Sequence, residues 1–318
     1  MNIDTRIKPP SGGEGGDRRV TKPLILPQVG HTPLFLIKSL STPKVSVWAK
    51  AEWQQPGGSV KARAARMIIK RAISCGSLHP GVSLLDASSG NTAIAYATLL
   101  QPLGWKPTIC LPSNASSARI KLLQSLGANL ILTSPLEGTD GAQVVARELH
   151  EQYPHRYYYA DQYSNDANWL AHYHTTALEI WSQTHQAVTH FVAGLGTTGT
   201  FTGTGRRLKE LGDVKLVALQ PDQPLHPLEG WKDLETARIP KIYDRTLADE
   251  VKAISTDETY AIIKFIARHE GLYLSPSSAA NLQGAIQVAG EIEEGMIVTT
   301  LADTLDRYPE VKKEIFNT

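Results

Sequence analysis

Lys61 is the residue whose type and surroundings point most directly to covalent chemistry. It follows Pro56-Gly57-Gly58-Ser59-Val60, and an amphipathic run with apolar residues at 64, 65, 68, 69, 72 and 73 begins just after it. Glycines let backbone approach a ligand closely, and Ser59 is a candidate N-cap for the helix. Lys61 would then lie in the first helical turn, where the dipole favours the neutral amine that forms Schiff bases with carbonyl groups. The competing interpretation is a surface lysine that opens an ordinary helix.

Two loops rich in small polar residues follow predicted strands. The first, Asp86-Ala87-Ser88-Ser89-Gly90-Asn91-Thr92, opens a predicted helix, and its N–H and hydroxyl groups suit a carboxylate or a phosphate. It could equally be a plain helix cap. The second, Gly194-Leu195-Gly196-Thr197-Thr198-Gly199-Thr200, contains no Lys or Arg, so it would hold a phosphate through backbone dipoles and hydroxyls.

The second loop also fits another ligand. Gly194, Gly196 and Gly199 match Gly-x-Gly-x-x-Gly, and Asp222 follows about 20 residues later, as in dinucleotide-binding βαβ units. However, a complete α/β lobe precedes this motif, and Asp222 lies past the expected end of the strand. The residues by themselves leave a phosphate ester and a dinucleotide open.

A third polar segment, Ser275-Pro276-Ser277-Ser278, lies between the apolar Leu272–Leu274 and a predicted helix. Serines at a helix start are usually caps. The functional alternative is a hydroxyl that faces a ring nitrogen.

Strand and helix patterns alternate along the chain from about residue 45. Strands are predicted at 45–51, 82–86, 108–111, 129–133, 157–161, 190–194, 215–220, 251–255 and 296–301, and helices at 61–74, 91–103, 117–126, 141–152, 169–184, 199–211, 257–270 and 278–289. This alternation is typical of parallel sheets with helices on both faces. The strands exceed one comfortable sheet, so we expect two open, twisted α/β lobes. Ligands bind beyond the carboxyl ends of such strands, where the first two loops lie.

Composition narrows the class of protein. The 318 residues are 42% hydrophobic and 20% charged, which suits a globular chain of one large domain or two ordinary ones. A net charge of +1 without basic runs gives no reason to expect nucleic acid or a membrane as partner. Cys75 and Cys110 are predicted to be unpaired core thiols, and the sequence contains no metal-ligand spacing. Residues 1–20 are predicted to be a disordered arm rather than a secretory signal, and we expect a soluble cytoplasmic protein.

Five segments, in order, resemble the cysteine synthases, which are pyridoxal-phosphate enzymes of the tryptophan-synthase-β-like fold (fold type II). The similar segments are Val29–Leu34, Pro56–Lys61, Ser89–Thr92, Asp161–Trp181 and Gly196–Thr200, the last in the form of B-type O-acetylserine sulfhydrylases. The resemblance runs from about residue 27 to 308. It implies a smaller lobe at 50–155 with the substrate loop, a larger lobe formed by 21–49 with 156–318, and a cofactor in the cleft between them. It also favours a cofactor phosphate over a dinucleotide in the glycine loop.

The resemblance implies roles for matching residues of this chain. Lys61 would form the Schiff base with pyridoxal 5'-phosphate and act as general base, Asn91 would bond the phenolic oxygen of the cofactor, and Ser277 would face its pyridine nitrogen. The cofactor phosphate would be held by Gly196, Thr197, Thr198, Gly199 and Thr200. The substrate carboxylate would be received by Ser88, Ser89, Thr92 and Gln162. A neutral serine would leave the pyridine nitrogen largely unprotonated, which makes the cofactor a weaker electron sink.

Some positions depart from the family pattern. Ala62 stands where the family has Asp, Ser88 where it has Thr, and Ala93, Ser275 and Ala279 where it has Gly. Added side chains at former glycines bring bulk to places where backbone lies close to a ligand. The departures therefore leave the substrate more open than the fold or the cofactor.

The implied reaction is β-replacement on an O-activated L-serine, either O-acetylserine or O-phosphoserine, through an aminoacrylate intermediate. The sulfur nucleophile would be sulfide, thiosulfate or a carrier-bound thiocarboxylate, and the product L-cysteine or a close analogue. The resemblance also implies a homodimer, with a sulfur-carrier protein or an acetyltransferase as candidate partners. The alternatives are a β-eliminating dehydratase or desulfhydrase, a weakly catalytic paralogue that binds a partner protein, and a nicotinamide enzyme using the glycine loop.

Overall fold

The computed structural model of the chain describes residues 6–7, 24–88 and 90–316. Backbone contacts of the described residues separate two compact units: unit 1 comprises those up to Val29 together with those of Lys61–Ala167, and unit 2 comprises Gly30–Val60 together with those from Asn168 onward. These bounds differ from the expected 50–155 because residues 50–51 end a strand of the sheet of unit 2, whereas residues 157–159 pair within the sheet of unit 1. Except for Arg6–Ile7, the predicted N-terminal arm at 1–20 lies outside the described residues.

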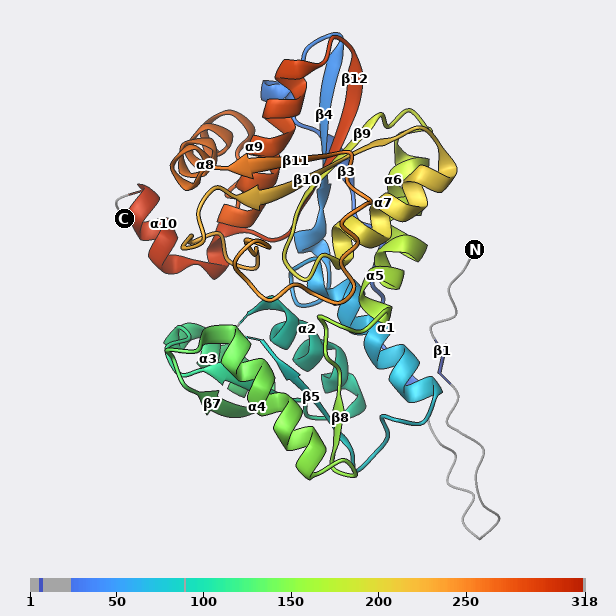
Figure 1. Ribbon diagram of the computed structural model, residues 1–318, viewed down its shortest axis with the longest axis vertical. Helices are drawn as coiled ribbons and strands as arrows, with labels where there is room; N and C mark the ends of the chain where they lie inside the picture. Colours follow the sequence, from blue (N-terminus) through green and yellow to red (C-terminus); the bar gives the residue numbers. More distant parts are fainter. Residues whose placement is uncertain (1–5, 8–23, 89, 317–318) are drawn as a thin grey trace. The chain divides into compact units, whose positions relative to one another are not determined.

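Unit 1 is built on a four-stranded, all-parallel sheet in the order β7-β6-β5-β8. Its elements are β1 (Arg6–Ile7), β2 (Leu24–Ile25), α1 (Lys61–Ser74), β5 (Ser83–Ala87), α2 (Asn91–Leu100), η3 (Gln101–Leu103), β6 (Thr108–Pro112), α3 (Ser117–Ser125), β7 (Asn129–Thr133), α4 (Gly138–Gln152), β8 (Tyr157–Tyr159) and α5 (Ala167–Ala171), the last crossing into unit 2. Successive residues of β5 face opposite sides, as the strand period requires. Leu84 is buried in one cluster with residues of α1 and α2, and Leu85 is buried in another with residues of α4. Figure 1 shows α1, α2 and α4 beside the strands of this sheet.

Unit 2 is built on a six-stranded sheet in the order β11-β10-β9-β12-β4-β3. Its elements are β3 (Leu34–Leu36), η1 (Lys38–Leu40), β4 (Val45–Ala51), η2 (Glu52–Gln54), the π-helical turn η4 (His172–Thr176), α6 (Ala177–Gln183), β9 (His190–Gly194), α7 (Gly199–Leu211), β10 (Lys215–Pro221), β11 (Glu250–Ile254), α8 (Thr256–Glu270), α9 (Pro276–Glu291), β12 (Gly295–Leu301), η5 (Leu305–Arg307) and α10 (Pro309–Phe316). Helices α8 and α9 cover one face, where Val192 is buried, and α6 and α7 cover the other, where Phe191 is buried.

The prediction of two parallel α/β sheets with helices on both faces is confirmed, although several elements differ locally. The edge strand β3 is antiparallel to β4, and the sequence pattern gave no sign of it. The single helix predicted at 169–184 is divided into α5, η4 and α6 by the π-helical turn. The last long helix begins at Pro276 rather than at 278, because proline suits the first helical position.

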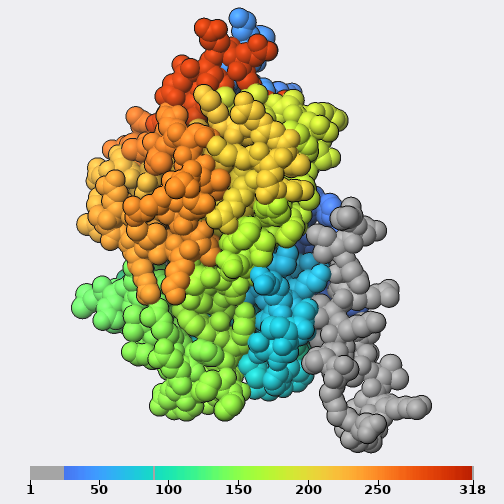
Figure 2. Space-filling view, turned by 45° about the vertical axis from the view of Figure 1, so that its right-hand side comes forward, coloured from blue at the N-terminus to red at the C-terminus, as the bar shows by residue number. Residues whose placement is uncertain are grey.

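A long segment of unit 2, residues 222–249, joins β10 to β11 without any helix or strand. It contributes much of the orange surface of that unit in Figure 2. Irregular loops longer than about 12 to 15 residues are uncommon in compact domains and are often functional. Part of this segment, residues 228–232, packs on the glycine-rich loop at residues 194–200. Among the described helices, none has the length and apolar character needed to cross a bilayer.

Candidate active site

Lys61 is the first residue of α1, as the sequence predicts. The glycines before it are required by the turn, because Gly57 and Gly58 have φ angles of 77° and 68°, a region that L side chains rarely adopt. The prediction that Ser59 caps the helix is wrong. Its hydroxyl is buried without a hydrogen-bond partner, and the helix begins only two residues later.

The loop 88–92 of unit 1 brings three of the predicted substrate residues together. The Ser88 hydroxyl accepts the backbone N–H groups of Gly90 and Ala93, at 3.2 and 3.3 Å. The Thr92 hydroxyl donates to Gln162 Oε1 at 2.7 Å, and Gln162 Nε2 donates to the carbonyl of Ala87 at 3.0 Å. Internal hydrogen bonds therefore set the shape of this loop. Asn91 is the first residue of α2, whereas Ser89 lies outside the described residues.

A carboxylate lies buried directly below this loop. Asp86, at the end of β5, is 1% exposed and accepts hydrogen bonds from the Ala87 N–H and from the Tyr96 hydroxyl, at 2.8 and 2.9 Å. Burial disfavours its charged form and raises the pKa of Asp86 to about 7, although the two donors partly offset this. The charge under the loop therefore changes near neutral pH, a property that its sequence did not reveal.

The glycine loop, defined as residues 194–200, connects β9 to α7 in unit 2 and carries an unusual threonine. Thr198 has φ 70°, which for a β-branched residue is a conformational outlier. Its hydroxyl is buried and makes no hydrogen bond. It stands at the N-cap of α7, where backbone N–H groups and the helix dipole favour an anion. A buried hydroxyl without a partner at this place fits an oxyanion such as the phosphate of a cofactor.

The glycines of this loop are needed for a reason that the sequence did not give. A Cβ on Gly194 would overlap the ring of Trp231, and a Cβ on Gly196 would overlap the carbonyl oxygen of Gly230. The segment containing Gly230 and Trp231 is held there by a 2.8 Å hydrogen bond from the Lys232 N–H to the carbonyl of Leu195. The Trp231 ring therefore excludes a side chain at Gly194, and a backbone carbonyl excludes one at Gly196.

Two buried residues from the α5–η4 segment support the glycine loop from behind. Asn168 Nδ2 donates to Thr197 Oγ1 at 3.1 Å, and the Asn168 side chain fills the space that a side chain on Gly199 would need. His172 Nε2 lies 3.3 Å from Thr200 Oγ1. Sequence reasoning missed both residues as supports of the loop, and the π-helical turn, a feature frequent at functional sites, was not visible in the pattern.

Helix α9 carries both Ser277 and Asn281, and Asn281 is hydrogen-bonded to the glycine loop. Asn281 Oδ1 accepts the Gly194 N–H at 2.8 Å, and Asn281 Nδ2 donates to the carbonyl of Thr300 at 2.7 Å. Ser277 stands one helical turn before Asn281, so both lie on one face of α9. The helix that carries Ser277 is thus hydrogen-bonded to the glycine loop within unit 2. Ser277 and Ser278 do not cap the helix, because the N-cap is Ser275, whose hydroxyl accepts the Ser278 N–H.

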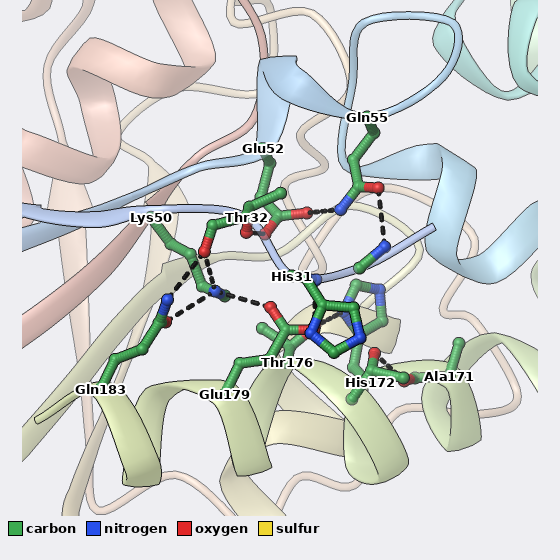
Figure 3. A network of polar contacts seen from close by, with 12 residues as sticks. His31, Thr32, Lys50, Glu52, Gln55, Ala171, His172, Thr176, Glu179 and Gln183 are labelled. Carbon is green, nitrogen blue, oxygen red and sulfur yellow. Dashed lines mark hydrogen bonds and ion pairs between the residues drawn. The ribbon is translucent and has the colours of Figure 1, made fainter. Parts of the chain in front are cut away.

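A buried ion pair fixes the segment that contains His31 and Thr32 (Figure 3). Lys50, with its side chain fully buried, lies 2.7 Å from Glu179 Oε2 and donates to the carbonyl of Thr32 at 2.9 Å. Glu179 Oε1 also accepts the His31 N–H at 3.0 Å. A buried charge pair is costly to break from one side, so this network ties β4 and α6 to residues 30–32. A lysine near the end of the mostly apolar strand 45–51 was its signal in the sequence.

The chain is similar to several known proteins in sequence and in structure. A family model described as pyridoxal-phosphate dependent enzyme matches residues 25–303. The chain is 42% identical over 299 residues to a cysteine synthase of Aquifex aeolicus, covering 91% of both chains. It is 37% identical over 291 residues to cysteine synthase B of Pseudomonas aeruginosa, covering 91% of this chain and 96% of that protein. The structure of O-acetyl serine sulfhydrylase isoform 3 from Entamoeba histolytica matches with a TM-score of 0.85 and 29% identity, covering 97% of this chain and 95% of that one.

Proposed function

Since this chain belongs to the pyridoxal-phosphate dependent enzymes of the cysteine synthase type, we propose that it exchanges the acetoxy group of O-acetyl-L-serine for sulfur and makes L-cysteine. The main structural support for a cofactor site is the Thr198 hydroxyl, which is buried without a hydrogen-bond partner at the N-terminus of α7. Nicotinamide chemistry, simple β-elimination and a purely partner-binding role are not favoured by these similarities.

Residues of unit 2 would hold the cofactor. The phosphate would lie against the backbone of Gly196 and Gly199 and the hydroxyls of Thr197, Thr198 and Thr200, with the dipole of α7 as the positive end. Ser277 would face the pyridine nitrogen, because it shares a helix face with Asn281, which binds the glycine loop. When bound, pyridoxal phosphate supplies an electron sink that makes the α-proton of an attached amino acid acidic.

Residues of unit 1 would handle the substrate and the proton. Lys61 would attach the cofactor through its amine, then take the α-proton of the substrate as general base and return it when sulfur has added. Its place at the start of α1 favours the neutral amine that both tasks need. Asn91 would bond the phenolic oxygen. Ser88, Thr92 and Gln162, together with Ser89, would bind the substrate carboxylate by exchanging internal hydrogen bonds for bonds to the ligand.

The experiment that tests the cofactor site is borohydride reduction of the purified protein, followed by peptide mass spectrometry. We expect the reduced cofactor on Lys61, and the K61A variant should lose both the label and the activity. Lys70 lies on the same helix, so K70A is the matched control and should keep both. A label on another lysine, or full activity in K61A, would contradict the proposal.

A screen of donors against acceptors tests the reaction itself. O-acetylserine and O-phosphoserine are each combined with sulfide, thiosulfate and a carrier thiocarboxylate, and the amino-acid product is measured. We expect L-cysteine with O-acetylserine and sulfide. Pyruvate without any acceptor-dependent product would instead identify an eliminating enzyme.

We also propose that the protein is a homodimer and that it resides in the cytoplasm. Family resemblance supports a homodimer, which the mass of the purified protein in light scattering will test. The prediction that Cys75 is a core thiol is wrong, because this thiol is exposed and unpaired, whereas Cys110 is buried. Unpaired thiols are typical of reducing compartments such as the cytoplasm. A sulfur-carrier protein or an acetyltransferase is the candidate protein partner.

A further inference from the structure

Three serines at the start of α9 form a connected set of hydroxyls. Ser275 and Ser278 are fully buried, and Ser277 is 7% exposed. Ser275 Oγ lies 3.2 Å from Ser277 Oγ and 3.0 Å from Ser278 Oγ. Because each hydroxyl carries one proton, the partners at one end of this chain of bonds determine the direction of every bond in it.

The direction is fixed at Ser278. Its hydroxyl lies 2.8 Å from the carbonyl oxygen of Asp303, and a carbonyl can only accept, so Ser278 must donate. The Asp303 N–H, at 3.2 Å, donates to the same hydroxyl. The single proton of Ser278 is therefore committed to Asp303, and Ser278 can only accept from Ser275.

The hydroxyl of Ser275 consequently donates its proton to the hydrogen bond with Ser278. Its lone pairs accept the Ser278 N–H, which makes it the N-cap of α9. The contact between Ser275 and Ser277 can then be a hydrogen bond only if Ser277 is the donor. The relay runs from Ser277 to Ser275 to Ser278 to the carbonyl of Asp303.

We propose that Ser275 is a positioning residue that holds the proton of Ser277, so that Ser277 presents a lone pair to the group it faces. The inference rests on the proposed function, in which that group is the pyridine nitrogen of the cofactor. An accepting hydroxyl stabilises a protonated ring nitrogen, whereas a donating hydroxyl stabilises an unprotonated one. Compared with a serine that is free to donate, the relay would therefore shift the ring nitrogen toward its protonated form.

The relay depends on a feature of this particular sequence. Ser275 stands where the cysteine synthase pattern has glycine, and a glycine has no hydroxyl to receive the proton of Ser277. Without Ser275, Ser277 is free to rotate and donate to the nitrogen. One ordinary hydrogen bond corresponds to about a three- to tenfold change in the ratio of protonated to unprotonated nitrogen.

The test compares holoproteins loaded with pyridoxal phosphate labelled with ¹⁵N in the ring, observed by NMR at one fixed pH. We expect the S275G signal to move toward that of unprotonated pyridine. S275T keeps the hydroxyl and should retain the parent signal. Glycine is nearly as good an N-cap as serine, so S275G keeps α9 folded, and thermal melts of both variants without cofactor check this.

The S277A variant distinguishes a failure of the proposed role of Ser277 from a failure of the relay. If S277A leaves the ring-nitrogen signal unchanged while cofactor still binds, Ser277 does not face the nitrogen and the proposed role of Ser277 fails. If S277A moves the signal but S275G does not, Ser277 keeps its role and the relay is overturned. If S275T moves the signal as far as S275G does, a structural effect explains the shift and the relay is likewise overturned.

Discussion

The glycine loop of unit 2 and the loop 88–92 of unit 1 hold their shapes in different ways. In the glycine loop steric exclusion adds to the hydrogen bonds from Lys232 and Asn168, because Trp231 and the Gly230 carbonyl lie where side chains on Gly194 and Gly196 would be. The hydroxyl of Thr198 in this loop is buried and has no hydrogen-bond partner. Hydrogen bonds shape the loop 88–92, where Thr92 donates to Gln162 and Ser88 accepts two backbone N–H groups.

The difference indicates two kinds of preparation for a ligand. A loop held by steric contacts keeps its shape when a permanent cofactor arrives, and its unused hydroxyl gains a partner. A loop held by its own hydrogen bonds can exchange them for bonds to a substrate that comes and goes at each turnover. Measurements of stability, of its dependence on pH and of cofactor affinity test this distinction.

The largest effect is expected from G196A, which attacks the packing of the glycine loop. The new Cβ meets a backbone carbonyl that cannot rotate away, so the loop or residues 228–232 must move. We expect a loss of about 3 kcal/mol or more in the free energy of unfolding, measured in urea. G290A is the control, because no atom lies near a Cβ at that position of α9. A G196A protein as stable as its parent would contradict steric shaping of this loop.

The next effect concerns pH and Asp86 in unit 1. Folding raises the pKa of Asp86 from 3.8 to about 7 through burial. Between these values the folded chain binds more protons than the unfolded chain, so the stability due to this group falls as pH rises, by at most a few kcal/mol. D86N should lack this fall between about pH 4 and pH 7.

Denaturant melts across this pH range check the prediction. D213N, at an exposed aspartate, is the control with the same change of charge and should keep the pH dependence of the parent. If D86N and the parent protein lose stability in parallel over this range, Asp86 does not titrate as described.

A smaller effect is expected from T92V, which removes a donor from the hydrogen-bonded loop without changing its volume much. Gln162 Oε1 loses the 2.7 Å bond from Thr92, and we expect a cost of about 1–3 kcal/mol in urea unfolding. Thr133 in the same unit is buried with a hydroxyl that has no partner, so T133V should be neutral or stabilising. Equal costs for the two variants would show that the Thr92 bond is not special.

The smallest change in stability is expected from T198G. Glycine tolerates φ 70°, so relief of backbone strain should stabilise the cofactor-free protein by roughly 1 kcal/mol, while titration with pyridoxal phosphate should show weaker binding. His31 has φ 55° in an exposed segment, so H31G should give a similar gain with unchanged affinity. Unchanged affinity in T198G would remove this hydroxyl from the cofactor site.

Much of the fold and part of the site could be predicted from local patterns. The bounds of β4, α1, β9 and α7 agree with the sequence, because strand and helix periods and the flanking glycines are local signals. The start of α1 at Lys61 follows from the same signals. The prediction of a helix cap at Ser59 was wrong, because a favourable residue type does not ensure that the helix begins next to it.

The sequence by itself determined the fold class, the family and the position of the amine, since these depend on residue types in order along the chain. The tertiary structure decided why glycine is required at 196, what supports Thr197 and Thr200, and in which direction the hydroxyl protons point. Each of these depends on a partner distant in sequence, such as Gly230, Asn168 or the carbonyl of Asp303. Steric exclusion and hydrogen-bond direction are set by atoms within a few ångströms, and only folding brings those atoms together.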